Sequence, residues 1–286
     1  MIELVIEQRR RDLGGFEVGR VLPHAGRRMV GPFIFFDHFG PMTFARGISR
    51  DVDVRPHPHI GLATVTYLFA GEIMHRDSVE SEQAIIPGEM NWMIAGSGIT
   101  HSERFERARA EGGPMHGLQS WVALPREHEE TTPAFAHFDR DDLPAFEADG
   151  MRLRLLAGEA FGVKSGVHTL SPLFYIHWQL AAGASVILPA QYSERAIYIV
   201  SGEIETDGQR FRAGQMPVFS KSAPAEVRAV VPSVVMGLGG EPVGERFIEW
   251  NFVSSSQERI EQAKADWRAG RMRLPIHDTE ERIPLP

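Results

Sequence analysis

The sequence predicts an all-β protein made of two similar β-barrel domains, with one short helix near the C-terminus. Three observations predict this fold. Twenty-eight glycines and nineteen prolines divide the 286 residues into short segments, many of them rich in Val, Ile, Phe and Tyr, as in β-sandwiches and barrels. One phrase of the first half recurs in the second half, and a helical pattern is clear only after residue 255. The length, at roughly 150 residues per domain, also allows two domains.

Composition excludes several classes of function. Thirty basic residues against thirty-eight acidic ones leave a net charge of -8, which disfavours direct binding of nucleic acid. The chain has no cysteine, and this excludes disulfides, thiolate metal sites, iron–sulfur clusters and a cysteine nucleophile. Any bound metal must therefore be held by histidine or carboxylate.

Neither export nor membrane insertion is expected. Residues 1–11 carry Glu3 and Glu7 among apolar residues and end in three arginines, which is not the order of a signal peptide. The longest weakly polar stretch, residues 230–240, contains Pro232 and is shorter than the roughly 20 apolar residues that a bilayer requires. We expect a soluble, cytoplasmic protein.

Local patterns predict individual strands and the helix. Strands are expected over residues 63–69, 195–200, 227–231 and 247–252, because each is apolar and is bounded by turn residues. Ser255 and Glu258 have the spacing of a capping box, and Gly270 can end a helix. One face of that helix would carry four residues: Ile260, Ala263, Lys264 and Trp267.

The division of the chain into two domains is predicted from an internal repeat. Residues 66–73 (TYLFAGEI) resemble residues 197–204 (IYIVSGEI), which follow 131 positions later. Residues 88–90 resemble residues 214–216 at an offset of 126. The same phrase also fits an ordinary hairpin. Read as a duplication, it predicts an N-terminal domain over residues 1–145 and a C-terminal domain over residues 146–286.

Two pairs of residues in the first half have the spacing of metal ligands. Side chains two apart on a strand face the same side, so His57 and His59 can point to one place, and so can His101 and Glu103. Three imidazoles and one carboxylate suit a divalent ion that keeps open coordination positions. Iron(II), manganese, nickel, copper and zinc all remain possible on this reasoning.

The second copy lacks these ligands. The repeat aligns an apolar segment, residues 188–190, with His57 and His59, and it aligns Val227 and Ala229 with the second pair. We therefore expect one metal ion per chain, in the N-terminal domain, and an apolar interior in the C-terminal domain.

The motifs around these residues resemble the pirin family of bicupins in order and spacing. The matching phrases are residues 37–41 (DHFGP), 57–59 (HPH), 75–78 (HRDS), 87–93 (PGEMNWM) and 95–103 (AGSGITHSE). The resemblance implies two tandem cupin barrels of the jelly-roll type. It also implies that His57, His59, His101 and Glu103 bind one iron ion, most readily Fe(II).

Some positions depart from the family pattern or have no assigned role. Ala63 and Thr64 stand where cupins often have a glutamate, and Ile60 stands where many pirins have an arginine, so the surroundings of the metal should be less polar. His75 and His116 are candidates for partners of the ligands, and a solvated loop histidine is an equal alternative. His38 has the same status.

The resemblance implies two kinds of function. One is a quercetin 2,3-dioxygenase-like oxidoreductase that takes a small aromatic substrate and O2, with Glu103 as catalytic base as well as ligand. The other is a non-enzymatic, redox-sensing regulator that binds a protein partner. A cupin enzyme for a smaller acid and a purely structural bicupin remain as further alternatives. We expect a monomer, because the duplication already packs two barrels in one chain.

Overall fold

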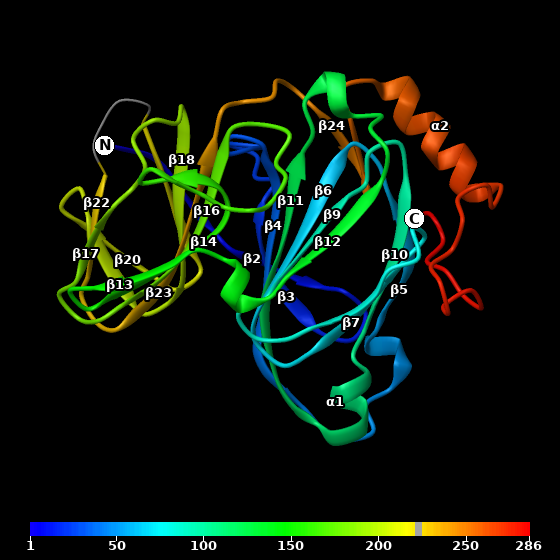
Figure 1. The fold of residues 1–286 in the computed structure, drawn as a ribbon, viewed down its shortest axis with the longest axis horizontal. Helices are drawn as coiled ribbons and strands as arrows, with labels where there is room; N and C mark the ends of the chain where they lie inside the picture. The colour runs from blue at the N-terminus through cyan, green and yellow to red at the C-terminus, as the bar shows by residue number, and fades with distance from the viewer. Residues whose placement is uncertain (221–224) are drawn as a thin grey trace. The chain divides into compact units, whose positions relative to one another are not determined.

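The computed structural model describes residues 1–220 and 225–286, which form two compact units built almost wholly from antiparallel strands (Figure 1). The first unit comprises residues 1–10, 19–36 and 140–243, and the second comprises residues 11–18, 37–139 and 244–286. We call the first the C-terminal unit, because most of its residues lie within 140–243, and the second the N-terminal unit, because most of its residues lie within 37–139. The all-β prediction is confirmed. No helix of the described residues is long and apolar enough to cross a membrane.

The N-terminal unit holds the metal-ligand candidates. Its strands lie in a larger sheet of order β12-β9-β6-β11-β4-β3-β2 and a smaller sheet of order β5-β10-β7-β8; the parts of β2, β3 and β4 within residues 1–10 and 19–36 belong to the C-terminal unit. The strands of these sheets are β2 (Arg9–Asp12), β3 (Glu17–Leu22), β4 (Phe33–Phe44), β5 (Val54–His59), β6 (Leu62–Ala70), β7 (Ile73–Asp77), β8 (Glu82–Ile85), β9 (Met90–Ile94), β10 (Ile99–Arg104), β11 (Gly113–Ala123) and β12 (Ala134–Phe138). A short helix, α1 (Glu106–Glu111), follows β10.

The C-terminal unit has the same design. Its larger sheet has the order β1-β21-β18-β23-β16-β14-β13, with β15 paired to β14, and its smaller sheet the order β17-β22-β19-β20. The strands are β1 (Ile2–Glu7), β13 (Ala145–Ala148), β14 (Met151–Ala160), β15 (Val163–Lys164), β16 (Leu173–Leu180), β17 (Ser185–Ile187), β18 (Glu194–Ser201), β19 (Glu203–Thr206), β20 (Gln209–Arg212), β21 (Gln215–Phe219), β22 (Glu226–Ala229) and β23 (Ser233–Gly240).

The predicted repeat is visible strand by strand. β6 is flanked by β9 and β11, and β18 by the equivalent β21 and β23. Gly71 and Gly202, the matched glycines of the repeat, have φ of +90° and +87°. A Cβ atom at either position would lie 2.6 Å from a backbone carbonyl oxygen, so both turns require glycine. Two barrels of one design follow from these matches.

One edge strand of the C-terminal unit comes from the start of the chain. β1 pairs with β21 in antiparallel register, with Val5 opposite Pro217, and it occupies the position that β12 occupies beside β9. Ile2 and Val5 pack against the core of that unit. The N-terminal segment therefore covers a sheet edge that would otherwise expose unpaired backbone groups.

The C-terminal unit has a large apolar core. Its core includes Phe174, Trp178 and Ile197, together with Val227 and Ala229 from β22. The last two occupy the repeat positions of the second ligand pair. They are buried in this core, as the sequence predicts.

The helix α2 (Gln257–Arg268) lies close to its expected position. Ile260, Ala263 and Trp267 pack into a cluster with Ile60 and Phe252, whereas Lys264 pairs with Glu249 at the surface. The predicted cap is wrong by one residue. Ser256, not Ser255, accepts the Arg259 amide at the helix start, because Ser255 donates to Glu129.

Three predicted strands are found with small shifts of their ends, and the fourth is wrong. Residues 247–252 form a hairpin of β24 (Phe247–Glu249) and β25 (Phe252–Ser254) instead of one strand. Trp250 in the turn has φ of +54°, a left-handed conformation that its residue type does not signal.

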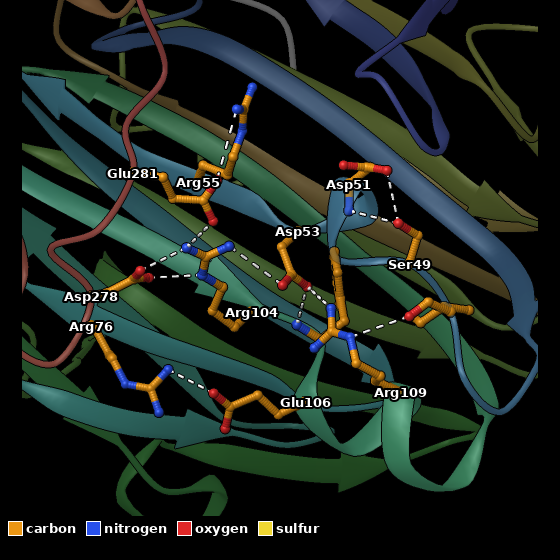
Figure 2. Close-up of polar contacts among 12 residues, drawn as sticks. Ser49, Asp51, Asp53, Arg55, Arg76, Arg104, Glu106, Arg109, Asp278 and Glu281 are labelled. Atoms are coloured by element: carbon orange, nitrogen blue, oxygen red, sulfur yellow. Dashed lines mark hydrogen bonds and ion pairs between the residues drawn. The ribbon is translucent and has the colours of Figure 1, made fainter.

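The C-terminal segment after α2 crosses the outer side of the smaller sheet of the N-terminal unit, where it lies beside β10 and β5 (Figure 1). Arg104 of β10, only 2% exposed, donates to Asp278 of that segment through two bonds of 2.7 Å. The same guanidinium reaches Asp53 and Glu281, and Figure 2 shows these carboxylates around it. The segment is thus tied by charge to the strand that carries His101.

Candidate metal centre

Strands β5 and β10 bring three histidines of the N-terminal unit together. The strands are antiparallel neighbours, and His101 lies directly opposite His57. One ring nitrogen from each of His57, His59 and His101 falls within 4.8 Å of the others, and the Nε2 atoms of His59 and His101 are 3.1 Å apart. All three side chains are buried. These three predicted ligands therefore form one group that could hold a metal ion.

Backbone carbonyls fix the outer nitrogens of two of these rings. His57 Nδ1 lies 2.8 Å from the Arg55 carbonyl oxygen, and His59 Nδ1 lies 3.0 Å from that of Asn251. A carbonyl oxygen only accepts, so each Nδ1 must carry the proton. The unprotonated Nε2 of each neutral ring is then free to bind a cation.

The third ring is fixed by a chain of two buried side chains. Asp77 Oδ2 lies 2.9 Å from His75 Nε2, and His75 Nδ1 lies 3.4 Å from His101 Nδ1. The carboxylate accepts from His75 Nε2–H, which leaves His75 Nδ1 as the atom that can accept from His101 Nδ1–H. Through His75, Asp77 thus supports the form of His101 in which Nε2 is unprotonated.

Burial keeps the three imidazoles neutral. Desolvation lowers the pKa of His57 to about 4, although the hydrogen bond to the Arg55 carbonyl opposes the shift, and the neighbouring His75 adds a smaller lowering contribution. The pKa values of His59 and His101 are lowered well below the ordinary value, first by desolvation and then by neighbouring histidines. Neutral imidazole is the form that binds metals.

The arrangement fits a divalent ion. Metal–nitrogen bonds of roughly 2.0 to 2.1 Å put adjacent ligand atoms about 3.0 to 3.4 Å apart, which matches the spacing of His59 Nε2 and His101 Nε2. With every Nδ1 protonated, the lone pairs of the inner nitrogens face one another. Their repulsion is relieved when a cation lies between them.

Glu103 is not in the group of three nitrogens. It lies two residues beyond His101 on β10, where the pairing with β5 is shifted, and it is half-buried. Its Oε1 accepts from Thr66 Oγ1 at 3.2 Å. Desolvation raises the pKa of Glu103 to about 7, although the Thr66 hydrogen bond opposes that shift.

Two of the positions that depart from the family pattern, Ile60 and Thr64, have different neighbours. Ile60 is buried in the cluster beneath α2, so it does not line the group of three histidines. Thr64 is directly opposite Trp121 on β11, and the Trp121 ring stands edge-on to His59 with centroids 5.1 Å apart.

The other histidine candidates differ in whether they contact the three-histidine group. His75 contacts His101, as described above. His116 lies elsewhere: its Nε2 is 2.7 Å from His38 Nε2, and its ring packs against Phe69.

Sequence reasoning missed three contributors to this site. Asp77 could have been found, because it follows His75 by two residues on one strand and shares its face. Trp121 carries no distinguishing signal. Asn251 acts through its backbone carbonyl, 192 residues from His59 in the chain, and no side-chain pattern encodes such a contact.

The described residues of the C-terminal unit contain no comparable group of ligands. Fold and site together define the protein as a duplicated β-barrel protein, with potential metal ligands in one barrel and an apolar core in the other.

The comparisons place the chain in a family. Residues 15–122 match the family model described as Pirin, and residues 175–273 match the Pirin C-terminal cupin domain. A pirin-like protein of Caulobacter vibrioides is 60% identical over 100% of both chains. The chain belongs to the pirin family, and its two units are cupin domains.

Solved structures show the same fold. A quercetin 2,3-dioxygenase of Acinetobacter baumannii is 31% identical, with a TM-score of 0.90 over 99% of this chain and 94% of the other. A bacterial pirin of Escherichia coli, in complex with nickel(II), is 18% identical, with a TM-score of 0.66 over 85% of this chain and 100% of the other. The second likeness concerns the fold alone.

Proposed function

We propose that this protein is a metal-dependent dioxygenase that cleaves flavonols such as quercetin with O2 at one mononuclear site. The observation that carries the proposal is the group of three buried ring nitrogens from His57, His59 and His101, with Nδ1 of His57 and of His59 held by backbone carbonyls. The likeness to a quercetin 2,3-dioxygenase at 31% identity over nearly the whole chain supports the substrate class.

In this proposal His57, His59 and His101 hold the metal ion, with Glu103 as a fourth ligand. Fe(II) is our favoured metal, and Mn, Ni, Cu and Zn also suit imidazole and carboxylate ligands. The nickel(II) in the E. coli pirin is a divalent ion of this group. A divalent ion held here would supply Lewis acidity toward a substrate hydroxyl and positions at which O2 can react.

Glu103 is the base of the proposed reaction. It faces the same interior as His101, and part of its surface is accessible to a substrate. Its carboxylate would accept the proton of the flavonol 3-hydroxyl. Thr66 Oγ1–H, which donates to Oε1, would hold the carboxylate in place.

The overall reaction balances without another reductant. The two carbon–carbon bonds that flank carbon 3 of the flavonol break, both atoms of O2 enter the ring-opened ester, and carbon 3 leaves as carbon monoxide. The flavonol supplies the electrons that reduce O2. The proton taken up by Glu103 returns to the product.

The test is oxygen-dependent loss of quercetin with detection of carbon monoxide, using the Fe(II)-loaded protein. We expect turnover by the parent and by His168→Ala, which changes an exposed histidine of the C-terminal unit, and no turnover by His101→Ala.

A parent protein that binds one Fe(II) at the three histidines but leaves quercetin and O2 unchanged would overturn the enzymatic proposal. The alternative would then be the non-enzymatic regulator that binds a protein partner. Equal turnover by parent and His101→Ala would overturn the assignment of the site.

A further inference from the structure

A second cluster of potential ligands lies where β9 begins and β12 ends in the N-terminal unit: His137 is in β12, Asp139 directly follows it, and Glu89 directly precedes β9. His137 is directly opposite Asn91 in the antiparallel pairing of these strands. Glu89 precedes Asn91 by two residues and Asp139 follows His137 by two, so all four side chains can share one face. One ligand atom from each of Glu89, His137 and Asp139 falls within 4.8 Å of the others.

The His137 ring is oriented by Asn91. Nδ1 of His137 lies 2.7 Å from Asn91 Oδ1, an amide oxygen that only accepts, so Nδ1 carries the proton. His137 Nε2 lies 3.3 Å from Asp139 Oδ1 and 3.5 Å from Glu89 Oε2. A divalent cation held among these three atoms would be bound by one imidazole nitrogen and two carboxylate oxygens.

The spacing of these atoms agrees with metal coordination. Metal bonds of roughly 2.0 to 2.2 Å to nitrogen and oxygen place adjacent ligands about 3.0 to 3.5 Å apart, and the separations of His137 Nε2 from the two carboxylate oxygens lie at the upper end of that range. An imidazole whose other nitrogen is held by a neighbouring acceptor is also the usual arrangement of a metal-binding histidine.

The surroundings leave room for water on the ion. The side chains of His137 and Glu89 are 16% and 14% exposed, whereas that of Asp139 is 72% exposed. Glu89 is anchored by the Ile86 amide, which donates to its Oε2 at 3.0 Å, and its carboxylate keeps further lone pairs for a ligand. Three side chains would thus bind the ion from one side, with solvent on the other.

We propose that Glu89, His137 and Asp139 form a second divalent cation site, selective for a transition metal such as Zn(II) or Mn(II). One imidazole and two carboxylates suit these ions better than Mg(II), which prefers oxygen ligands alone. This site shares no residue with the three-histidine centre. It departs from the sequence-based expectation of one metal ion per chain, and its exposed ligand makes it the weaker site.

The test is equilibrium dialysis of the full chain against Zn(II), with bound zinc counted by elemental analysis. Thiolate binding cannot contribute, because the chain has no cysteine. We expect two equivalents in the parent and in a His168→Ala control, and one equivalent in His137→Ala. Asp139→Asn changes an exposed side chain that folding does not require, and we expect its second zinc to bind at least about 10-fold more weakly.

The outcomes separate the two sites. His101→Ala should keep the second equivalent and lose the first. Loss of zinc in His137→Ala but not in His101→Ala would overturn the three-histidine centre and leave the second site standing. One equivalent in the parent that is lost in His101→Ala but kept in His137→Ala, or parent-like binding by both Asp139→Asn and His137→Ala, would overturn the second site and leave Glu89, His137 and Asp139 as an ion-paired cluster.

Discussion

Asp77 Oδ2 lies 2.9 Å from His75 Nε2, and both side chains are buried, at 0% and 3% exposure. The other oxygen of Asp77 accepts the amides of Val79 and Ser81 at 3.0 and 2.9 Å, so the carboxylate cannot turn away. The ring of Phe135 stacks on the ring of His75, with centroids 4.4 Å apart and an angle of 17° between the planes. A rigid support for His101 follows from these contacts.

Asp77→Asn should therefore weaken metal binding. An amide in place of the carboxylate can donate to His75 Nε2, which would reverse the ring's protonation and turn its Nδ1 into a donor toward His101. We expect the affinity of the three-histidine centre to fall by about 10- to 100-fold. Competition between the protein and a chelator for Ni(II) measures this, with Asp141→Asn, an exposed change, as control.

A melting temperature recorded for each metal-free variant separates lost affinity from lost folding. His75→Phe gives a second route to the same question, because it removes the acceptor for His101. Parent-like affinity in a folded Asp77→Asn protein would contradict the supporting role of Asp77.

Arg104→Met should release the C-terminal segment and destabilise the N-terminal unit by about 3 kcal/mol, because it leaves the buried Asp53 carboxylate with fewer partners. Urea unfolding measures the stability. Hydrogen exchange at the amides of Ile276 and Ile283, which bond to the carbonyls of Asp77 and Pro56, reports release of the segment and should accelerate.

Arg107→Met is the matched control for that change. Arg107 is exposed and pairs with Glu72 and Glu111 at the surface, so its loss should cost far less stability than the loss of Arg104. Equal effects of the two substitutions would show that burial of the Arg104 network adds nothing to stability.

The sequence predicts the metal-ligand candidates well because strand periodicity governs them. His57 and His59 are two residues apart, a spacing that a β-strand converts directly into a shared face, and the pairing of β10 with β5 places His101 opposite His57. The repeat predicts the apolar second barrel for the same reason, since Val227 and Ala229 fall where ligands would otherwise be.

Features that depend on contacts distant in the chain are not predictable in this way. The sequence predicts Ser255 as the cap of α2, but Ser256 is the cap, because Ser255 donates instead to Glu129, which lies more than 120 residues earlier. The Asn251 carbonyl reaches His59 only because a turn at Trp250 folds residues 247–254 into a hairpin. Neither partner is marked by local sequence.

His177 should make the C-terminal unit sensitive to acid. Desolvation, followed by the charge of Arg154, lowers the pKa of His177 to about 3, so the unfolded chain takes up this proton first as pH falls. The stability from a neutral His177 is fully present above roughly pH 6.5 and declines below it, by about 2 kcal/mol at pH 5.

His177→Gln should reduce this dependence, because glutamine does not titrate. Urea midpoints at pH 7 and pH 5 compare the parent, His177→Gln and the exposed control His168→Gln. An equal loss of stability on acidification in all three proteins would show that His177 does not contribute to the pH dependence.

Glu103→Gln tests the base of the proposed reaction. Glutamine keeps the size of the side chain and can still meet Thr66 Oγ1, but it cannot accept the proton of a flavonol hydroxyl. Loss of a general base typically lowers kcat by about 10²- to 10⁴-fold, whereas the three histidines should still retain metal, with reduced affinity if the carboxylate is a ligand.

Turnover per bound iron, with iron measured in the same sample, separates the two effects. Full turnover per iron would exclude Glu103 as the base, and unchanged iron affinity would exclude it as a ligand, so each half of the assignment can fail independently.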